Sequence, residues 1–367
     1  MKIAEIHIEN FKSIRNLELK FNSINILIGG NGAGKSNLIS YFKLLNNIST
    51  ENLQSFVSKN SGADTFLYFG KKNSKYLSSE IIFSKKKNQN SYSFQLGPTS
   101  EDNFYFEKER IGFDKGSLGK NWYSEDLGSG HLETKLFDNL KKQESWGVSD
   151  YVAAAFKQFK VYHFHDTSDT ASVKQTSNIN DNAILREDAS NLASFLYKLQ
   201  KVTPENFKQI EAIVQLVAPF FQKFNLNPNQ LDPEKIRLEW LEVGSDKYFN
   251  ANNLSDGTLR MICLATLLLQ PNPPSTIIID EPELGLHPSA INVLAALIKS
   301  VSLTTQIIIS TQSVTLINQF APENIIIVDR KEQQSSFRHI SENELEGWKE
   351  EYALGEIWEK NIIGGRP

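Results

Sequence analysis

Residues 29 to 36 combine the residue types and the spacing that phosphate binding requires. The stretch reads Gly29-Gly-Asn-Gly-Ala-Gly-Lys-Ser36 and lies between an apolar run and a helix-like pattern. Glycines let successive backbone N–H groups turn inward around phosphate oxygens, and a helix that begins near Lys35 adds its positive end. The spacing predicts a nucleotide site in which Lys35 reaches the β- and γ-phosphates and Ser36 ligates Mg²⁺. The residues expected to hold the nucleotide here are Gly29, Asn31, Gly32, Ala33, Gly34, Lys35, Ser36 and Asn37.

Two adjacent acids follow a second apolar run, which reads Thr276-Ile-Ile-Ile-Asp280 and continues into Glu281. A carboxylate at the end of a buried strand can hold the Mg²⁺ shell, which is the role expected of Asp280. The next carboxylate can polarise an attacking water, and a general base of this kind typically contributes ~10²–10⁴-fold in rate. An apolar run before two acids is weak evidence alone, but together with the glycine-rich loop it predicts ATP hydrolysis with Glu281 as the base.

A third motif, Leu254-Ser-Asp-Gly-Thr258, directly precedes a helical pattern. Ser255 is a natural helix N-cap, and capping alone would explain its presence. The serine hydroxyl and the Gly257 amide at a helix N-terminus also form an anion site. The motif therefore has both a structural and a functional interpretation.

Alternating strands and helices must position these motifs. The run Ile24-Asn-Ile-Leu-Ile28 predicts a central strand before the glycine-rich loop, and a helical pattern follows from Asn37. Beyond residue 254, buried strands alternate with helices, which predicts a parallel sheet covered on both faces. The expected helices there are 259–269, 290–300 and one near Thr315, and the expected strands are 276–279, 307–309 and 325–328.

The middle of the chain differs in pattern and is expected to be inserted into this core. Short alternating runs at 66–69, 76–83, 92–96 and 104–106 predict an antiparallel sheet within a β-rich segment 60–115, with lysine-rich turns at 70–72 and 85–88. Residues 114–150 are polar and predict a loop, and 161–164 predict a return to a core strand. Helical patterning between 188 and 223 predicts a helical insertion over 175–235, before a strand at 236–241. We thus expect a discontinuous head over 1–340 and a C-terminal aromatic tail over 341–367.

Composition narrows the classes of function. The formal net charge is −4, so nucleic acid would have to contact local basic patches. Cys263 is the only cysteine, which excludes a disulfide framework and a cysteine zinc site. The N-terminus lacks a signal-peptide pattern, and no run of roughly 18 apolar residues occurs. We therefore expect a cytoplasmic protein without a membrane segment.

The motifs, in this order, resemble the ABC-type ATPase heads of the SMC, RecF and OLD group. The opening Ile8-Glu-Asn-Phe-Lys-Ser-Ile14 and the stretch Pro282-Glu-Leu-Gly-Leu-His-Pro288 are also similar to that group. The tail Leu354 to Pro367 resembles that of bacterial stand-alone RecF-like AAA family ATPases. The resemblance implies an α/β P-loop NTPase fold of the ABC-type head, with an added antiparallel β-sheet and a helical insertion.

In such heads, two copies face each other across ATP. The resemblance implies that Ser255 and Gly257 of one subunit complete the site of the other and that residues 285–287 line the dimer seam. It places Lys12 and Ser13 near the nucleotide. ATP would bind the closed homodimer better than separate heads, and hydrolysis would remove that preference.

One position departs from the group's pattern. After Ile307-Ile-Ile-Ser-Thr311, where a switch histidine is common, this sequence has Gln312. Glutamine can donate a hydrogen bond to a γ-phosphate or orient water, but it cannot become cationic. Gln312 is therefore counted with Glu281 and Lys35 as a catalytic residue, although a satisfied strand-end amide is an equal interpretation, and hydrolysis is expected to be slow.

Several weaker candidates remain open. The group's Q-loop residue is not obvious, and its candidates are His165, Asp166 and, less well placed, Gln54. Four other candidates each have an ordinary structural alternative. Two are a metal site at His163, His165 and Asp166 and a link from Arg186 and Asn191 to the nucleotide. The other two are DNA contacts by Lys71, Lys72, Lys75, Lys85, Lys86 and Lys87 and a docking surface formed by Trp348, Tyr352, Leu354, Ile357 and Trp358.

The sequence therefore predicts an ATP-dependent molecular switch that binds Mg·ATP, dimerises and hydrolyses slowly. The resemblance suggests a bacterial role in DNA repair or anti-phage defence. OLD proteins fuse such a head to a TOPRIM nuclease domain, so a separately encoded TOPRIM-like nuclease is the expected partner, with DNA as a further one. The alternatives are the nucleotide-binding subunit of an ABC transporter and a scaffold that binds nucleotide without hydrolysis.

Overall fold

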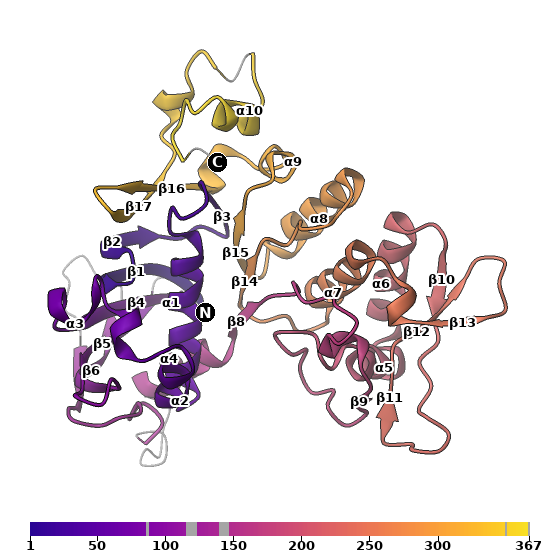
Figure 1. Ribbon diagram of the computed structural model, residues 1–367, viewed down its shortest axis with the longest axis horizontal. Coiled ribbons are helices and arrows are strands. Elements are labelled where there is room, and N and C mark those ends of the chain that lie inside the picture. Colours follow the sequence, from indigo (N-terminus) through magenta and orange to yellow (C-terminus); the bar gives the residue numbers. More distant parts are fainter. Residues whose placement is uncertain (86–87, 115–122, 139–146, 349–350, 366–367) are drawn as a thin grey trace.

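A parallel sheet lies between two lobes in the computed structural model, which describes residues 1–367 except 86–87, 115–122, 139–146, 349–350 and 366–367 (Figure 1). One lobe contains the chain's first strands and an antiparallel sheet. The other lobe is mainly helical and contains the middle of the chain. The C-terminal segment lies at one end of the parallel sheet and shares a core with residues 24–28.

The parallel sheet has the strand order β17-β16-β3-β15-β14-β8. Its strands are β3 (Ile24–Ile28), β8 (Phe159–Tyr162), β14 (Thr276–Asp280), β15 (Gln306–Thr311), β16 (Ile325–Lys331) and β17 (Gln334–His339). Neighbours pair in parallel except β17, which pairs antiparallel with β16. The predicted parallel sheet is therefore confirmed, and the carboxyl ends of β3, β14 and β15 meet at one edge.

Helices cover both faces of this sheet because its strands are apolar on both sides. Leu27 packs on the side of α1 (Lys35–Ser49), whereas Ile26 and Ile28 pack on the side of α7 (Asp256–Leu269) and α8 (Pro288–Val301). Each predicted helix of the second block is present, and each begins within a few residues of its expected start. Helix α9 (Val314–Ile317) is a single short turn after β15.

The antiparallel sheet has the order β2-β1-β4-β5-β6-β7. Its strands are β1 (Lys2–Phe11), β2 (Ile14–Lys20), β4 (Leu77–Lys85), β5 (Asn88–Pro98), β6 (Phe104–Asp114) and β7 (Tyr123–Gly128). Helices α1, α2 (Leu53–Lys59) and α4 (Val148–Lys157) contribute side chains to the same core as this sheet. The sheet therefore joins the first strands to the inserted β-rich segment.

Three local predictions for this lobe are wrong. Residues 66–69 are not a strand, because a 3-10 helix (Ala63–Phe66) buries Phe66 against Phe11. The turn expected at 70–72 is the short helix α3 (Gly70–Asn73). Within 114–150, expected to be a loop, the described residues include β7 and the start of α4, whose Val152 is fully buried.

The helical lobe contains α5 (Leu192–Val202) and α6 (Pro204–Val217), and α6 ends before Pro219 as proline requires. A small sheet, β10 (Phe221–Phe224), β12 (Glu239–Glu242) and β13 (Tyr248–Asn250), packs its aromatic rings against one another. The single strand expected at 236–241 is instead divided between β11 (Lys235–Ile236), which pairs with β9 (Ser177–Asn178), and β12.

The C-terminal segment contains α10 (Leu354–Glu359), in which Ile357 and Trp358 are fully buried. Packing on the chain's own core, the simpler interpretation of this aromatic tail, accounts for these two residues. Trp348 remains 39% exposed.

The described residues contain no helix whose length and hydrophobicity would let it span a membrane. Further short 3-10 turns are Ser172–Lys174, Ala251–Asn253, Pro322–Asn324 and Glu342–Leu345.

Candidate nucleotide site

The glycine-rich loop connects the fully buried strand β3 to the first turn of α1. Gly34 has φ 125° and Gly32 has φ 76°, which are conformations that residues with a Cβ rarely adopt. A Cβ on Gly29 would lie 2.3 Å from the Val328 carbonyl oxygen, whereas one on Gly32 would meet nothing within 4 Å. The loop is therefore tight against β16 at its start and open at its middle, as a phosphate cradle requires.

Lys35, the first residue of α1, folds back over this loop. Its Nζ donates to the carbonyl oxygens of Gly29 and Gly30, the latter at 3.2 Å, and the residue is buried. Burial lowers the pKa of Lys35, and the carboxylates of Glu281, Asp280 and Glu283 oppose that shift. The lysine therefore lies within the electrostatic reach of the acids that end β14, although the two motifs are far apart in sequence.

Ser13 and Asn37 form a second support for the loop. Asn37 Nδ2 donates to Ser13 Oγ at 2.6 Å, and Ser13 Oγ lies 2.6 Å from Ser335 Oγ. Lys12 points elsewhere: its Nζ donates to Ser40 Oγ at 2.7 Å and lies 5.3 Å from the Phe66 ring centroid. Ser13 thus contacts the predicted site directly, whereas Lys12 packs along α1.

Asp280 and Glu281 end β14 beside β15. The Asp280 carboxylate accepts a hydrogen bond from Ser310, the residue that pairs with it across the sheet. Glu281 donates its backbone N–H to the Ser310 carbonyl at 2.9 Å and has φ 40°. A left-handed glutamate is uncommon and turns the chain sharply at the strand end. The turn directs the two neighbouring carboxylates to different partners.

The Glu281 side chain is held by Gln312. Gln312 Nε2 donates to Glu281 Oε1 at 2.8 Å. Behind this pair, Glu283 Oε1 accepts from Thr311 Oγ1 at 2.5 Å and from the Gln312 N–H at 3.3 Å, while its Oε2 is buried without a hydrogen-bond partner among the described residues. Burial raises the pKa of Glu283, against hydrogen bonds that lower it. Two carboxylates thus flank one amide at the site.

The oxygens of Ser36 and Asp280 suit a magnesium ion. Ser36 is exposed at the first turn of α1 and Asp280 ends the neighbouring part of the sheet. Hydroxyl and carboxylate oxygens are the hard donors that Mg²⁺ prefers, with water and phosphate completing its shell. The open cradle at Gly32, the buried Lys35 ammonium and this oxygen pair together fit a magnesium-bound triphosphate.

Ser255 and Gly257 lie in the other lobe. Ser255 caps α7, because its Oγ accepts from the Thr258 N–H at 3.2 Å, so the capping interpretation is correct. Both Ser255 and the following Asp256 are exposed. A Cβ on Gly257 would lie 2.3 Å from the Gly285 carbonyl oxygen. The motif therefore packs on the loop after Glu281. Within one chain, its hydrogen bonds and close approaches among the described residues do not reach the glycine-rich loop.

Arg260 of α7 connects this motif to the loops that follow β8 and β14 of the parallel sheet. Its guanidinium donates to the carbonyl oxygens of Phe164 at 3.0 Å, His165 at 2.8 Å and Leu284 at 2.6 Å. His165 Nε2 lies 2.8 Å from the Asp280 carbonyl oxygen. Of the Q-loop candidates, His165 is therefore beside the end of β14, Asp166 is exposed and bonded to Ser168, and Gln54 is bonded to Leu132 in the antiparallel lobe.

Arg186 and Asn191 organise the start of α5. Asn191 accepts from the Arg186 N–H at 2.9 Å and donates to the carbonyls of Asp181 and Ile184, and Arg186 pairs with Asp181 at 2.6 Å. These contacts are internal to one loop. The helix-boundary interpretation of this segment therefore accounts for both residues.

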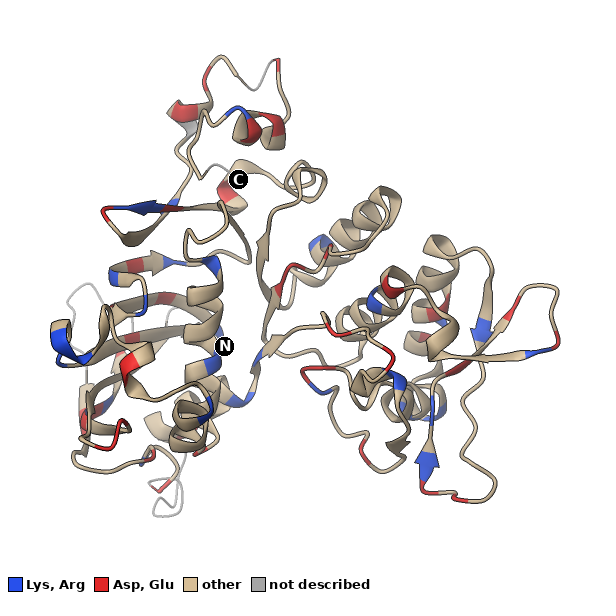
Figure 2. Cartoon of the chain, in the orientation of Figure 1, with Lys and Arg blue, Asp and Glu red and all other residues tan. Residues whose placement is uncertain are grey.

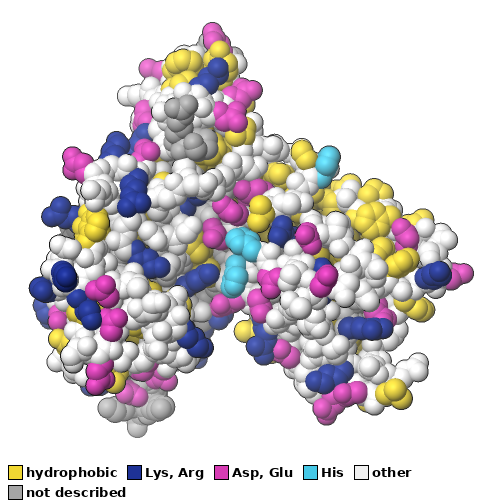
Figure 3. Space-filling view, in the orientation of Figure 1, with side chains coloured by type: hydrophobic (Ala, Val, Ile, Leu, Met, Phe, Trp, Pro, Cys, Tyr) yellow, Lys and Arg dark blue, Asp and Glu magenta, His cyan; other side chains and the backbone are white. Residues whose placement is uncertain are grey.

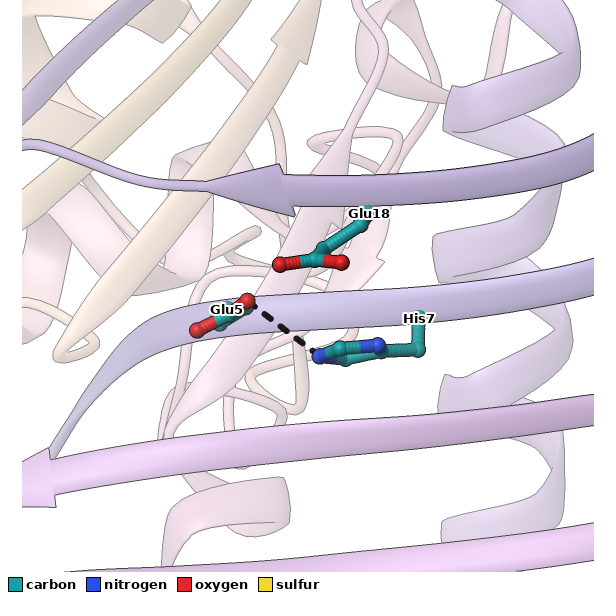
Figure 4. Close-up of side chains that lie close together, drawn as sticks. All are labelled: Glu5, His7 and Glu18. Carbon is teal, nitrogen blue, oxygen red and sulfur yellow. Dashed lines mark ion pairs between the residues drawn. The ribbon is translucent and has the colours of Figure 1, made fainter.

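A metal cluster at His163, His165 and Asp166 does not form. His163 Nδ1 is buried without a partner, and among the described residues one group brings three potential metal ligands together, Glu5, His7 and Glu18. Figure 4 shows these side chains on the antiparallel sheet, with Glu5 and His7 on β1 and Glu18 on β2. Glu5 and His7 lie 3.3 Å apart as an ion pair. Their closeness is therefore explained without an ion.

Basic side chains are dispersed over the molecule rather than gathered in one stripe (Figure 2). Lys71 and Lys72 belong to α3, and Lys71 pairs with Asp102 at 2.7 Å. Of the other predicted DNA-contacting lysines, Lys86 and Lys87 lie outside the described residues. On the face in Figure 3, histidine and acidic side chains gather in the hollow between the lobes.

Sequence reasoning missed three residues of this site. Ser335 contacts both Ser13 and the loop, Arg260 joins the loops after β8 and β14, and Glu283 supports Gln312. Glu283 lies within the stretch Pro282–Pro288, and Arg260 follows Thr258 by two residues. Their positions in and beside these two motifs could have indicated that they belong to the site. A serine in a polar hairpin such as Ser335 carries no comparable signal.

Comparisons with known proteins agree with this geometry. A family model described as "AAA domain, putative AbiEii toxin, Type IV TA system" matches residues 24–318. The chain is similar to the SMC head bound to the C-winged-helix domain of ScpA, with a TM-score of 0.62 and 16% identity, covering 93% of this chain and 98% of that one. It is also similar to the SMC head domain with an extended coiled coil bound to the C-terminal domain of ScpA from Pyrococcus furiosus, with a TM-score of 0.60, 15% identity and coverage of 95% and 99%.

Those structures confirm the predicted P-loop ATPase head fold and the resemblance to the SMC group. A curated relative, ABC transporter A family member 11 of Dictyostelium discoideum, is 34% identical over 89 residues. That match spans 24% of this chain and 10% of the relative, so it concerns one segment of a much longer protein.

Proposed function

The chain belongs to the AAA domain family matched over residues 24–318, and on that basis we propose that it is a switch that binds Mg·ATP and hydrolyses it slowly. One observation carries the proposal: Lys35 is buried with its Nζ on the Gly29 and Gly30 carbonyls of the loop, and the carboxylates of Glu281 and Asp280 oppose the lowering of its pKa by burial. A lysine in a phosphate cradle facing two strand-end acids is suited to a triphosphate and its cation.

Each residue has a distinct role in this proposal. The backbone of the loop and Lys35 hold the phosphates, and Ser36 and Asp280 supply oxygen ligands to magnesium, which when bound neutralises phosphate charge. Glu281 takes a proton from the attacking water. Gln312 fixes the direction of the Glu281 carboxylate through its 2.8 Å hydrogen bond but cannot carry a positive charge. Slow hydrolysis follows from that neutral group.

We propose that ATP closes a homodimer. Ser255 is exposed at the N-terminus of α7, and its side chain bonds Thr258 rather than any described residue of its own glycine-rich loop. A second copy would bring this serine and the Gly257 amide to the γ-phosphate, with residues 285–287 at the seam. The exposure of Leu284, 45%, beside that seam supports a surface that a partner covers.

Phosphate release and gel filtration test this proposal together. The wild type should release phosphate with Mg·ATP, and Glu281→Gln should release ~10²–10⁴-fold less while eluting as an ATP-dependent dimer. Glu323→Gln, an exposed carboxylate outside the proposed site, is the matched control and should behave as wild type. Equal release by wild type and Glu281→Gln would remove Glu281 from the mechanism, and no release by either would favour a non-hydrolysing scaffold.

The biological role in the proposal rests on the RecF and OLD resemblance. We propose that the switch controls a DNA-processing or anti-phage effector, with a separately encoded TOPRIM-like nuclease as its partner. If such a gene lies adjacent, its deletion should abolish protection from phage in a strain that carries the ATPase. Unchanged protection would refute the pairing without affecting the ATPase proposal.

The transporter alternative is tested by the location of the protein. A nucleotide-binding subunit would co-sediment with membranes that contain its permease. Recovery in the membrane fraction with a permease would replace the effector proposal, whereas hydrolysis itself is common to both functions.

A further inference from the structure

The C-terminal residues 354–365, here called the strap, contact both sides of the nucleotide site. Helix α10 forms the start of the strap and packs beside α9, and α9 begins two residues after Gln312. The Gly355 N–H donates to Asn318 Oδ1 at 2.6 Å. A Cβ on Gly355 would lie 2.9 Å from the Val314 carbonyl oxygen, so α10 can approach α9 this closely only with glycine there.

The other end of the strap lies on the first glycine of the phosphate loop. The Gly365 N–H donates to Asp329 Oδ1 at 2.8 Å, and the Gly365 carbonyl accepts from Trp358 Nε1 at 2.5 Å. Gly365 has φ 66°, and a Cβ there would lie 3.6 Å from Gly29 Cα and 2.9 Å from Ile327 Cγ2. Trp358 is fully buried, so its ring anchors this turn while its N–H fixes the backbone against the loop.

The hairpin β16–β17 completes this support. Ser335 Oγ donates to the Ala33 carbonyl at 2.5 Å, and its N–H donates to the Ser13 carbonyl at 2.7 Å. A Cβ on Gly34 would lie 2.1 Å from Ser335 Oγ. The same hairpin holds the strap, because Arg338 donates to the Ile363 carbonyl at 2.7 Å. Strap, hairpin and phosphate loop therefore form one connected layer.

From these contacts we infer that the strap is a positioning element for the nucleotide site: Trp358 and Gly365 fix the phosphate loop, and Gly355 fixes the segment that carries Gln312. This inference rests on the proposed function. Simple apolar anchoring of a C-terminal helix would explain the buried Trp358 ring, but not a directed N–H contact to the residue that lies on Gly29. Trp358→Phe removes the donor together with part of the buried ring volume. Ile357→Val removes only apolar volume from the same helix and is its matched control, so only Trp358→Phe should affect the phosphate loop.

The main experiment measures equilibrium binding of a fluorescent ATP analogue with Mg²⁺ and the steady-state kinetics of phosphate release. We expect Trp358→Phe and Gly365→Ala to weaken binding about 10-fold. The first removes the hydrogen bond that holds Gly365 beside Gly29, and the second adds a methyl group 2.9 Å from Ile327 Cγ2 at a positive φ. Gly355→Ala should lower kcat more than affinity, since it displaces α9 and Gln312. Thr304→Ala is the control, because Thr304 is exposed and its Oγ1 donates to the Val301 carbonyl at the end of α8, apart from the strap and its hairpin.

A second readout keeps the inference independent of activity and of folding. Hydrogen exchange of residues 29–37 in nucleotide-free protein should be faster in Trp358→Phe than in wild type, at equal exchange of β5 and β6. Wild-type exchange and wild-type binding in a folded Trp358→Phe variant would overturn the strap inference and leave the proposed function intact. Failure of the wild type itself to bind Mg·ATP would overturn the proposed function. In that case, wild-type exchange of residues 29–37 in Trp358→Phe would overturn the strap inference as well.

Discussion

Gln312 Nε2 donates a hydrogen bond to Glu281 Oε1 at 2.8 Å, across the edge where β15 and β14 end. An uncharged amide thus aims the carboxylate that we propose as the general base. The Gln312 backbone is itself held by Glu283, so the direction of Glu281 depends on a chain of two contacts. This geometry leads to the first prediction.

Gln312→Ala should lower kcat about 10-fold, because Glu281 loses a hydrogen bond worth roughly 1.4 kcal/mol. Affinity for Mg·ATP should change little, since Gln312 acts through Glu281. Phosphate release and nucleotide binding measure the two quantities separately. Gln319→Ala, a partly buried glutamine in the same segment, serves as the control. A Gln312→Ala variant with wild-type kcat would leave Gln312 as a structural amide only.

The second prediction concerns Glu283, whose pKa burial raises above the ordinary value. Because the folded protein holds this proton more tightly than the unfolded chain, its contribution to the free energy of unfolding is complete below the ordinary glutamate pKa and is lost as pH rises through the raised pKa. Glu283→Gln keeps an acceptor oxygen but cannot ionise. The stability of the wild type relative to this variant should therefore fall as pH rises from the ordinary glutamate pKa through the raised pKa of Glu283.

Thermal unfolding of nucleotide-free protein across that range measures this difference. Glu323→Gln should instead follow the wild type in parallel at every pH, since that side chain is exposed. Parallel curves for Glu283→Gln as well would show that the buried carboxyl is no harder to ionise than an ordinary one.

Arg260 supports the third prediction. Its guanidinium satisfies three backbone carbonyls, of Phe164, His165 and Leu284, and a lysine ammonium cannot reproduce that fork. Arg260→Lys should lower the free energy of unfolding by about 2–4 kcal/mol, because buried acceptors lose their donors. Urea denaturation measures the loss. Arg237→Lys, an exposed arginine, should stay within about 0.5 kcal/mol of wild type. Similar stabilities for the two variants would contradict a bridging role for Arg260.

The nucleotide core could be predicted from sequence because its signals are local. The apolar run Ile24–Ile28 stops at glycine and forms β3 at those bounds. Asp280 likewise ends β14, where the apolar run stops. Each boundary is set by a residue type that cannot continue the pattern. The fold class and the order of the motifs followed from these signals.

The errors arose where tertiary contacts overrule local pattern. Aromatic alternation at 66–69 predicts a strand, yet Phe66 closes a 3-10 turn under Phe11. The run 236–241 divides because its two halves pair with different strands, β9 and β10. The role of Ser335 depends on a hairpin that meets the loop across more than 300 residues, and no pattern within the sequence indicates that contact.

The central claim is that two chains share each ATP, and mixing two inactive variants tests it most directly. Lys35→Ala should lose nucleotide binding in its own loop, and Ser255→Arg should block the contact made to a partner's loop. In a 1:1 mixture, some dimers contain one chain of each variant. One of the two sites in such a dimer is intact, because the Ser255→Arg chain supplies Lys35 and the Lys35→Ala chain supplies Ser255. We predict negligible phosphate release by each variant alone and partial recovery in the mixture. A mixture as inactive as its components, or full activity of Ser255→Arg alone, would contradict the shared site.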